Sequence, residues 1–214
     1  MNAAVPRIYE KLLAHFGHLQ WWPAQSPYEV MVGAVLTQNT AWRNVEKAIA
    51  NFGGQLSPQF VRDVDTEMLI DIIRPAGFFN QKALYLKALT AWFAQYNYDI
   101  STAQREPPDK LRTQLLTVKG IGKETADCVL LYALGLPTFV VDAYTVRLCA
   151  RYGLDAGDKY DAVKDFFEAS LPRDATLFNN YHAAIVHLGK DFCRKNKPLC
   201  GACPLGDACA RVGV

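Results

Sequence analysis

Four cysteines lie close together in the last quarter of the chain. They are Cys193, Cys200, Cys203 and Cys209, in the pattern C-x6-C-x2-C-x5-C. In a chain without other signs of secretion, such a run indicates a metal or cluster site more often than a disulfide framework. Thiolates are preferred ligands of zinc and of iron–sulfur centres. The run therefore predicts one small inorganic centre held by four thiolates.

The loop lengths bear on which centre this is. A zinc ribbon uses two C-x2-C knuckles, and only Cys200 and Cys203 form one here. Cys193 and Cys209 would reach in singly across loops of unequal length, which suits the corners of a cubane. We expect a [4Fe-4S] cluster, with zinc as the alternative. The other two cysteines, at positions 128 and 149, lie in apolar helical patterns and are expected to be small buried hydrophobic residues.

A second candidate site is the segment Val118-Lys119-Gly120-Ile121-Gly122, which joins two apolar stretches of helical spacing. Its glycines permit positive φ and leave backbone amides bare at the start of the next helix. Bare amides at a helix N-terminus bind phosphate, and Lys119 and Lys123 add attraction to a nucleic-acid backbone. The segment by itself fits an ordinary turn with solvated lysines equally well.

A carboxylate follows about twenty residues later, where the hydrophobic run Pro137-Thr-Phe-Val-Val ends in Asp142 at an expected helix start. An aspartate there could simply be an N-cap. The four histidines, His15, His18, His182 and His187, show no ligand spacing that competes with the cysteines.

The elements that must position these residues are helices. Apolar residues recur at helical spacing, separated by Gly, Pro, Ser, Asn and Asp clusters, with almost no strand pattern. The pattern predicts an all-α fold. The expected helices are residues 7–16, 30–36, 43–52, 67–74, 82–96, 109–116, 124–134, 144–152, 160–171 and 177–188.

Composition sets the outer limits. With 214 residues, 50% hydrophobic and 21% charged, the chain can bury a core and form one large or two small domains. The net charge is only +2, so basic residues must be judged by their location. The N-terminal segment has no apolar h-region, and no stretch is long enough to span a bilayer. We expect a cytoplasmic protein or a bacterial nucleoid-associated one.

Three motifs together carry a family resemblance. The G-x-G hairpin, VVDAYTVR at residues 140–147 and the four-cysteine run, in this order, resemble the endonuclease III superfamily of helix-hairpin-helix DNA glycosylases over roughly residues 26–209. The resemblance implies a two-domain fold. Residues 26–136 would form a six-helix barrel domain with the hairpin, and residues 1–25 plus 137–214 an iron–sulfur cluster domain.

The resemblance also implies roles. Asp142 would be the catalytic carboxylate at the mouth of a cleft between the domains. It would stabilise the oxocarbenium-like sugar of a flipped nucleotide or activate the attacking water. The cluster would be largely structural and would shape a basic loop that meets DNA. Arg194, Lys195 and Lys197 fit that loop.

One position departs from the strand-cutting members of the family. They have a lysine two residues beyond the second hairpin glycine, and this chain has Glu124 there. A carboxylate cannot form the Schiff base that a lyase needs. Lys123 is one residue away, which on a helix turns its side chain roughly 100° off the active face. Glu124 could instead lie near Asp142 and raise the pKa of one carboxyl group, or be a solvated first-turn glutamate.

The substrate class is indicated by aromatic residues. Trp21-Trp22-Pro23 and the later Leu36-Thr-Gln-Asn-Thr-Ala-Trp42 resemble the 3-methyladenine DNA glycosylase III branch, although core packing is the alternative for any isolated tryptophan. In that branch the positions of Trp22 and Trp42 sandwich the alkylated base, with Trp21 beside them. An alkylated purine is cationic, so indole faces attract it by roughly 0.5–2 kcal/mol.

Three further residues receive DNA roles from the same resemblance. Gln38 and Asn39 fall where family members insert an amide side chain into the gap left by the flipped nucleotide. Phe78 falls where they wedge an apolar side chain into the opposite strand, although a buried turn aromatic fits as well.

The sequence thus predicts a monofunctional DNA glycosylase for alkylated purines, acting as a monomer on double-stranded DNA. The alternatives are a thymine or uracil mismatch glycosylase, a bifunctional endonuclease III-type enzyme, and a non-catalytic iron–sulfur DNA-binding module.

Overall fold

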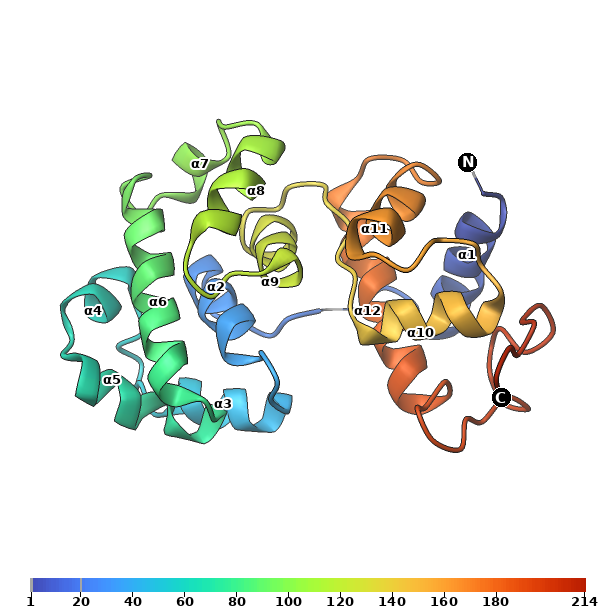
Figure 1. Cartoon of the computed structure of the whole chain (residues 1–214), viewed down its shortest axis with the longest axis horizontal. Coiled ribbons are helices and arrows are strands. Elements are labelled where there is room, and N and C mark those ends of the chain that lie inside the picture. The colour runs from blue at the N-terminus through green and yellow to red at the C-terminus, as the bar shows by residue number, and fades with distance from the viewer. Residues whose placement is uncertain (1, 20) are drawn as a thin grey trace. The chain divides into compact units, whose positions relative to one another are not determined.

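The structure is a computed structural model, and it describes residues 2–19 and 21–214. Within these residues the chain folds into twelve α-helices, one 3₁₀ turn and one π-helical turn, without a strand (Figure 1). The chain divides into two compact units. We call residues 22–136 the central unit, and residues up to 21 together with 137–214 the terminal unit. Among residues 2–19 and 21–214, no helix combines the length and the hydrophobicity that a membrane span requires.

The central unit is built around two helices, at residues 27–36 and 79–94. Its elements are α2 (Pro27–Leu36), α3 (Trp42–Ala50), α4 (Pro58–Asp63), α5 (Thr66–Ile73), the 3₁₀ turn η1 (Arg74–Ala76), α6 (Phe79–Ala94), α7 (Ile100–Ala103), α8 (Pro108–Thr117), α9 (Lys123–Cys128) and the π-helical turn η2 (Val129–Ala133). Helices α2, α4 and α5 pack against α6 (Figure 1). Every residue of α2 from 30 to 36 is buried, as expected for a helix that is apolar all round.

Two helices of this unit, α4 and α7, are missing from the sequence prediction. They have six and four residues, too few to display a helical period. Only the N-cap residues of these two helices could have indicated them in the sequence. Ser57 accepts a hydrogen bond from the Phe60 amide, and Asp99 accepts from the amides of Ser101 and Thr102.

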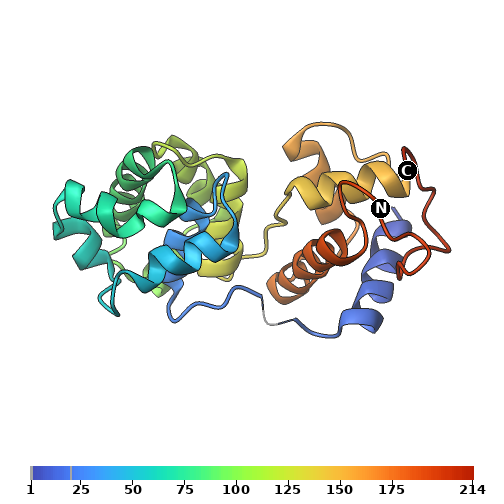
Figure 2. The same cartoon turned by 90° about the horizontal axis from the view of Figure 1, so that it is seen from below.

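The terminal unit contains α1 (Ala4–Phe16), α10 (Ala143–Tyr152), α11 (Tyr160–Glu168) and α12 (Ala175–Asp191). Helices α1 and α10 pack against α12, and Figure 2 shows α1 in blue beside it. Four rings, Phe139, Phe167, Phe178 and Tyr181, contact one another in its core. After α12 the chain continues as an irregular segment that carries the four cysteines, which we call the cysteine loop (residues 192–211).

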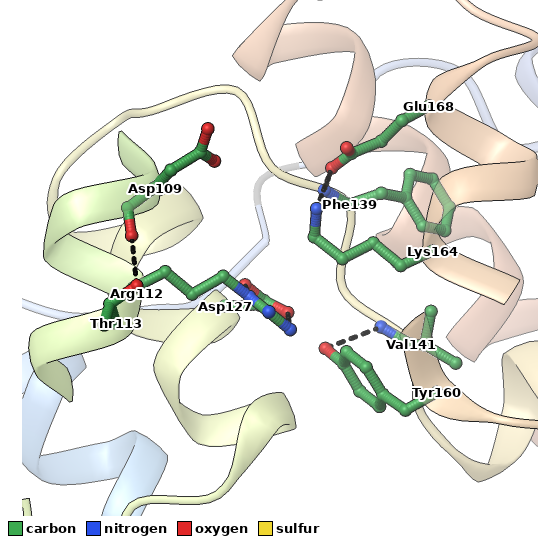
Figure 3. A network of polar contacts seen from close by, with 9 residues as sticks. All are labelled: Asp109, Arg112, Thr113, Asp127, Phe139, Val141, Tyr160, Lys164 and Glu168. Atoms are coloured by element: carbon green, nitrogen blue, oxygen red, sulfur yellow. Dashed lines mark hydrogen bonds and ion pairs between the residues drawn. The ribbon is translucent and has the colours of Figure 1, made fainter. Parts of the chain in front are cut away.

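The chain enters α10 through an extended segment that α11 holds in place. The Phe139 amide donates to Glu168 Oε1 over 2.7 Å, and the Val141 amide donates to the Tyr160 hydroxyl over 3.4 Å (Figure 3). Lys164 Nζ lies 2.7 Å from the same Glu168 oxygen. Side chains of α11 therefore replace a neighbouring strand and fix the backbone that leads into Asp142.

Candidate functional site

Asp142 is the N-cap of α10. One of its carboxylate oxygens, Oδ1, accepts hydrogen bonds from the Thr145 amide over 2.8 Å and from the Thr145 hydroxyl over 3.0 Å. The other oxygen, Oδ2, lies 3.6 Å from His182 Nε2 of α12. Only 13% of the Asp142 side chain is exposed. The capping reading of the sequence is therefore right, and it leaves one oxygen available for chemistry.

The surroundings keep Asp142 charged. Burial acts to raise the pKa of its carboxyl group, but the charge of the nearby His182 ring and the hydrogen bonds from Thr145 outweigh burial. The net pKa lies below the ordinary value for aspartate. An ionised carboxylate in a largely buried position can stabilise a developing positive charge or accept a proton from water.

His182 is a residue that sequence reasoning did not assign to the site. The histidines have no shared ligand spacing, and no pattern in the sequence connects position 182 to position 142. The Trp21 indole packs against the His182 ring with centroids 6.0 Å apart. The Nε1 atom of Trp21 is buried and has no acceptor among the described residues.

Trp22 belongs to the central unit and has an unusual backbone. Its φ is 65°, a conformation that costs a bulky residue energy. Its indole lies against Gly33, where a Cβ would come within 3.1 Å of Nε1, and that buried Nε1 has no acceptor in the part of the chain that the structure describes. Strain and an unsatisfied donor at one residue are typical of functional positions.

Two further rings contact Trp22, and we call the three the aromatic cluster (Trp22, Trp42 and Tyr132). The Tyr132 ring is tilted by 31° at a centroid distance of 5.2 Å, and the Trp42 ring is nearly perpendicular, at 79° and 5.5 Å. Tyr132 was not predicted from the sequence. It lies in the π-helical turn η2, a feature frequent at functional sites.

The arrangement of Trp22 and Trp42 differs from the expected sandwich. The two indoles touch edge to face, so a base fits between parallel rings only if Trp42 turns. Trp42 Nε1 donates to Glu46 Oε1 over 3.0 Å, and this bond holds the ring in the observed orientation.

The hairpin (residues 118–122) is shaped by two glycines with different roles. Gly120 has φ +83°, and a Cβ there would lie 2.2 Å from the Tyr85 ring. Gly122 does not use the positive φ that glycine permits. It is an extended N-cap at φ −88°, with open space around a built Cβ. Lys119, Lys123 and Glu124 are exposed around it.

A buried ion pair braces the two helices that flank the hairpin. Asp127 of α9 is fully buried, and Arg112 of α8 reaches it with two bonds (Figure 3), Nε to Oδ1 at 2.8 Å and Nη2 to Oδ2 at 3.1 Å. Bidentate pairs of this kind fix geometry as well as charge. The backbone amides at the start of α9 are therefore presented on a rigid frame.

Gln38 and Asn39 are placed very differently. Gln38 Nε2 donates to the Gly120 carbonyl and to Thr125 Oγ1, both over 3.0 Å, so this amide is occupied in supporting the hairpin. Asn39 is exposed and has φ 51°. Of the two amides assigned to the DNA gap, Asn39 is the one that faces solvent.

Phe78 is also presented outward. Its side chain is 64% exposed and its φ is 48°, which excludes the alternative of a buried turn aromatic. Four residues further along the chain, the buried Lys82 donates to the carbonyls of Leu36 and Ala76 over 2.8 Å each. Burial lowers the pKa of Lys82 to about 8. Thr40 Oγ1 donates to the same Ala76 carbonyl. The loops of Asn39 and Phe78 are thus tied together.

The four cysteines gather around one pocket of the terminal unit. The pocket is lined by Arg151, Phe192, Cys193, Cys200, Cys203, Gly206, Cys209, Arg211 and Val214. Within residues 2–19 and 21–214, no group of three or more His, Cys, Asp or Glu side chains is arranged as it would be around a bound metal ion. Burial, and next the charges of the other three thiols, raise the pKa of Cys203 despite a hydrogen bond from the Leu205 amide. The four side chains are soft sulfur donors that line one pocket, and sulfur is the donor type that zinc and iron–sulfur centres take. Cys128 and Cys149 are buried.

Two arginines of α10 hold the cysteine loop. Arg147 Nε donates to the Cys193 carbonyl over 2.7 Å, and Arg151 donates to the carbonyls of Arg194 and Lys195 over 2.6 and 3.0 Å. Neither arginine was assigned this role from the sequence. The side chains of Arg194, Lys195 and Lys197 in this loop are exposed.

Comparison with known proteins places this geometry in context. A family model described as "HhH-GPD superfamily base excision DNA repair protein" matches residues 32–173. The chain is 48% identical to a protein of Methanocaldococcus jannaschii named as a candidate DNA repair glycosylase, over 95% of this chain and 94% of the relative.

Two solved structures share the fold of this chain. A trapped endonuclease III–DNA covalent intermediate matches with a TM-score of 0.82 at 24% identity, covering 97% of this chain and 95% of the other. A 3-methyladenine DNA glycosylase of H. pylori bound to 1,N6-ethenoadenine matches with a TM-score of 0.72 at 29% identity, covering 87% and 94%.

Proposed function

The chain belongs to the HhH-GPD superfamily of base excision DNA repair proteins and is a DNA N-glycosylase, and we propose that it releases alkylated purines such as 3-methyladenine without cutting the strand. Its substrate would be double-stranded DNA from which the damaged nucleotide has been flipped. The observation that carries the proposal is the aromatic cluster, because Trp22 bears both a strained backbone and an unsatisfied Nε1.

The chemistry of the base supports this choice. An N-alkylated purine carries a delocalised positive charge, so an electron-rich indole or phenol face attracts it. The same charge makes the base a good leaving group that needs little acid assistance. A neutral thymine or uracil would instead need hydrogen-bond partners for its Watson–Crick edge. Aromatic faces with few polar groups fit the charged base better.

Asp142 supplies the other half of the reaction. As the bond from the sugar to the base lengthens, positive charge grows on C1′ and the ring oxygen. The ionised carboxylate, with Oδ1 fixed by Thr145, would stabilise this charge through Oδ2 or take the proton of the attacking water.

The test is base release from DNA treated with a methylating agent, compared with release from a G·T duplex. We expect free 3-methyladenine from the first and nothing from the second. Trp42→Phe should retain most activity because it keeps a ring face, whereas Trp42→Ala should lose roughly tenfold, the lower range of a cation–π contact plus stacking. Thymine release without release of methylated purine would contradict the proposal.

Lack of lyase activity follows from Glu124, which occupies an exposed first-turn position of α9. We expect strand breaks in treated DNA only after alkali. A Glu124→Lys variant should gain an amine that forms a Schiff base with an abasic sugar. Borohydride should then trap this variant on DNA, while the wild type and Lys123→Gln stay untrapped. Trapping of the wild type would show that another amine acts, with Lys123 as the first to examine.

We further propose that Cys193, Cys200, Cys203 and Cys209 hold a [4Fe-4S] cluster, which when bound would brace the cysteine loop for DNA contact. The purified chain should contain about four irons and four sulfides. Cys200→Ser should lose them and expose residues 193–209 to protease, whereas Cys128→Ala should keep them because Cys128 is buried in the central unit. One zinc per chain in place of iron would overturn this assignment.

A further inference from the structure

We propose that His182 is a positioning residue for Asp142, whose imidazole fixes the reactive carboxylate oxygen and offsets its burial. The inference rests on the proposed function, because it concerns the carboxylate that acts in base release. It adds a partner to Asp142 that lies 40 positions away in the sequence.

The geometry gives the two carboxylate oxygens different partners. Oδ1 is committed to Thr145, which donates to it twice. Oδ2 lies 3.6 Å from His182 Nε2, beyond a hydrogen bond but within the range of an ion pair. A movement of a few tenths of an ångström would convert this contact into a hydrogen bond. The oxygen left for the sugar or the water is therefore the one that His182 faces.

Packing holds the imidazole in this orientation. His182 is 4% exposed and lies in the buried part of α12. The Trp21 indole meets its ring edge-on, at 75°. A side chain enclosed in this way cannot swing to another partner without opening the packing between α12 and Trp21. It can act on Asp142 with little loss of conformational entropy on each turnover.

Other charged groups of the surrounding elements are engaged elsewhere. On α10, Arg147 bonds the carbonyls of Cys193 and Gly189 and lies over the Tyr144 ring. On α12, His187 is 3.8 Å from Asp191, and Lys190 Nζ lies 5.9 Å above the Trp21 ring. Tyr160 of α11 accepts from the Val141 amide, and Tyr9 of α1 packs on Tyr181. His182 is thus the titratable group placed against Oδ2.

The charge balance gives the direction of the effect. Burial alone would raise the pKa of Asp142, and His182 is the largest of the contributions that reverse this. Without the imidazole, the carboxylate would need a higher pH to ionise. The acidic limb of the rate profile should therefore move to higher pH. A residue with a merely structural role would lower the rate by the same factor at every pH.

Two variants separate these outcomes. His182→Leu removes the ring nitrogens, while His182→Gln keeps an N–H donor near the Nε2 position and does not titrate. Single-turnover base release by the full chain would be measured from about pH 4 to 8, a range that covers the ordinary titration of carboxyl groups and of imidazoles. We expect the acidic limb of the His182→Leu profile to lie at higher pH than that of the wild type. The loss should be largest at the acid end of the range, about tenfold for each pH unit of displacement, and should disappear toward pH 8. His182→Gln should restore most of the rate at neutral pH. A His182→Leu profile parallel to that of the wild type would overturn the proposal.

A second measurement does not depend on activity. Carbon-13 NMR of the carboxyl groups, with the Asp142 signal assigned by its loss in Asp142→Asn, gives the midpoint at which Asp142 titrates. We expect this midpoint to be higher in His182→Leu than in the wild type, and an unchanged midpoint would reject the inference. If the wild type released no alkylated base, the proposed substrate would fail, and the NMR result would still decide the role of His182.

Discussion

Asp142→Asn is expected to lower the rate of base release by roughly 10²–10⁴-fold while leaving the fold and the affinity for DNA intact. Asparagine is as good an N-cap as aspartate, and its carbonyl oxygen can accept the two hydrogen bonds from Thr145. The change therefore removes the charge and little else. Single-turnover base release, DNA binding by fluorescence anisotropy and urea unfolding would be measured on the same preparation.

The chain offers a matched control. Asp174 is also an N-cap aspartate, at the start of α12, and its Oδ1 accepts from the Leu177 amide over 2.8 Å. It is exposed, and it has no part in the proposed reaction. Asp174→Asn should therefore match the wild type in rate and stability. If Asp142→Asn kept its rate within a factor of about three, well below the contribution of a catalytic base, Asp142 would not be the carboxylate that acts in base release.

Gly120→Ala is expected to destabilise the protein by at least about 2 kcal/mol and to abolish tight DNA binding. The added methyl group would lie 2.2 Å from Cγ and Cδ1 of Tyr85, and the backbone has φ +83°. Either the ring or the hairpin must move. The hairpin can move only by giving up the hydrogen bond between Gln38 Nε2 and the Gly120 carbonyl. Urea unfolding and a salt titration of DNA binding would measure both effects.

Gly122→Ala separates folding from DNA contact at the same hairpin. Its φ is −88° and no atom lies within 4 Å of a built Cβ, so the variant should unfold at nearly the same urea concentration as the wild type. A methyl group there would still keep a phosphate from the amides at the start of α9. We expect a loss of about tenfold in affinity, or roughly 1.4 kcal/mol. Equal stability of Gly120→Ala and Gly122→Ala would contradict the hairpin geometry.

Local pattern was enough to predict the all-α class. Helices such as α6 and α12 are long enough to show their period, and the family motifs named the cysteines, the hairpin and Asp142. Short α4 and α7 were missed because they show no period. The sequence permits positive φ at both hairpin glycines, and only the structure shows that Gly120 adopts it while Gly122 caps α9 in an extended conformation.

What could not be predicted depends on contacts between distant positions. His182 meets Asp142 across 40 residues, and Arg151 meets the backbone of Arg194 across 43. Tyr132 joins Trp22 because η2 is a π-helical turn, which places its side chains out of the α-helical phase. Glutamine and asparagine at positions 38 and 39 look alike in sequence, and only the fold separates the one that supports the hairpin from the one that faces solvent.

The position of Asp142 at one end of α10, with Arg147 and Arg151 further along the same helix, limits how this chain can vary in length. Inserting one residue into a helix advances everything beyond it by roughly 1.5 Å and turns it by roughly 100°. Such an insertion between Thr145 and Arg147 would point both arginines away from the carbonyls of residues 193–195 while Asp142 stayed in place. The turn at residues 153–159 can gain or lose residues without this effect, whereas α10 must keep its number of residues.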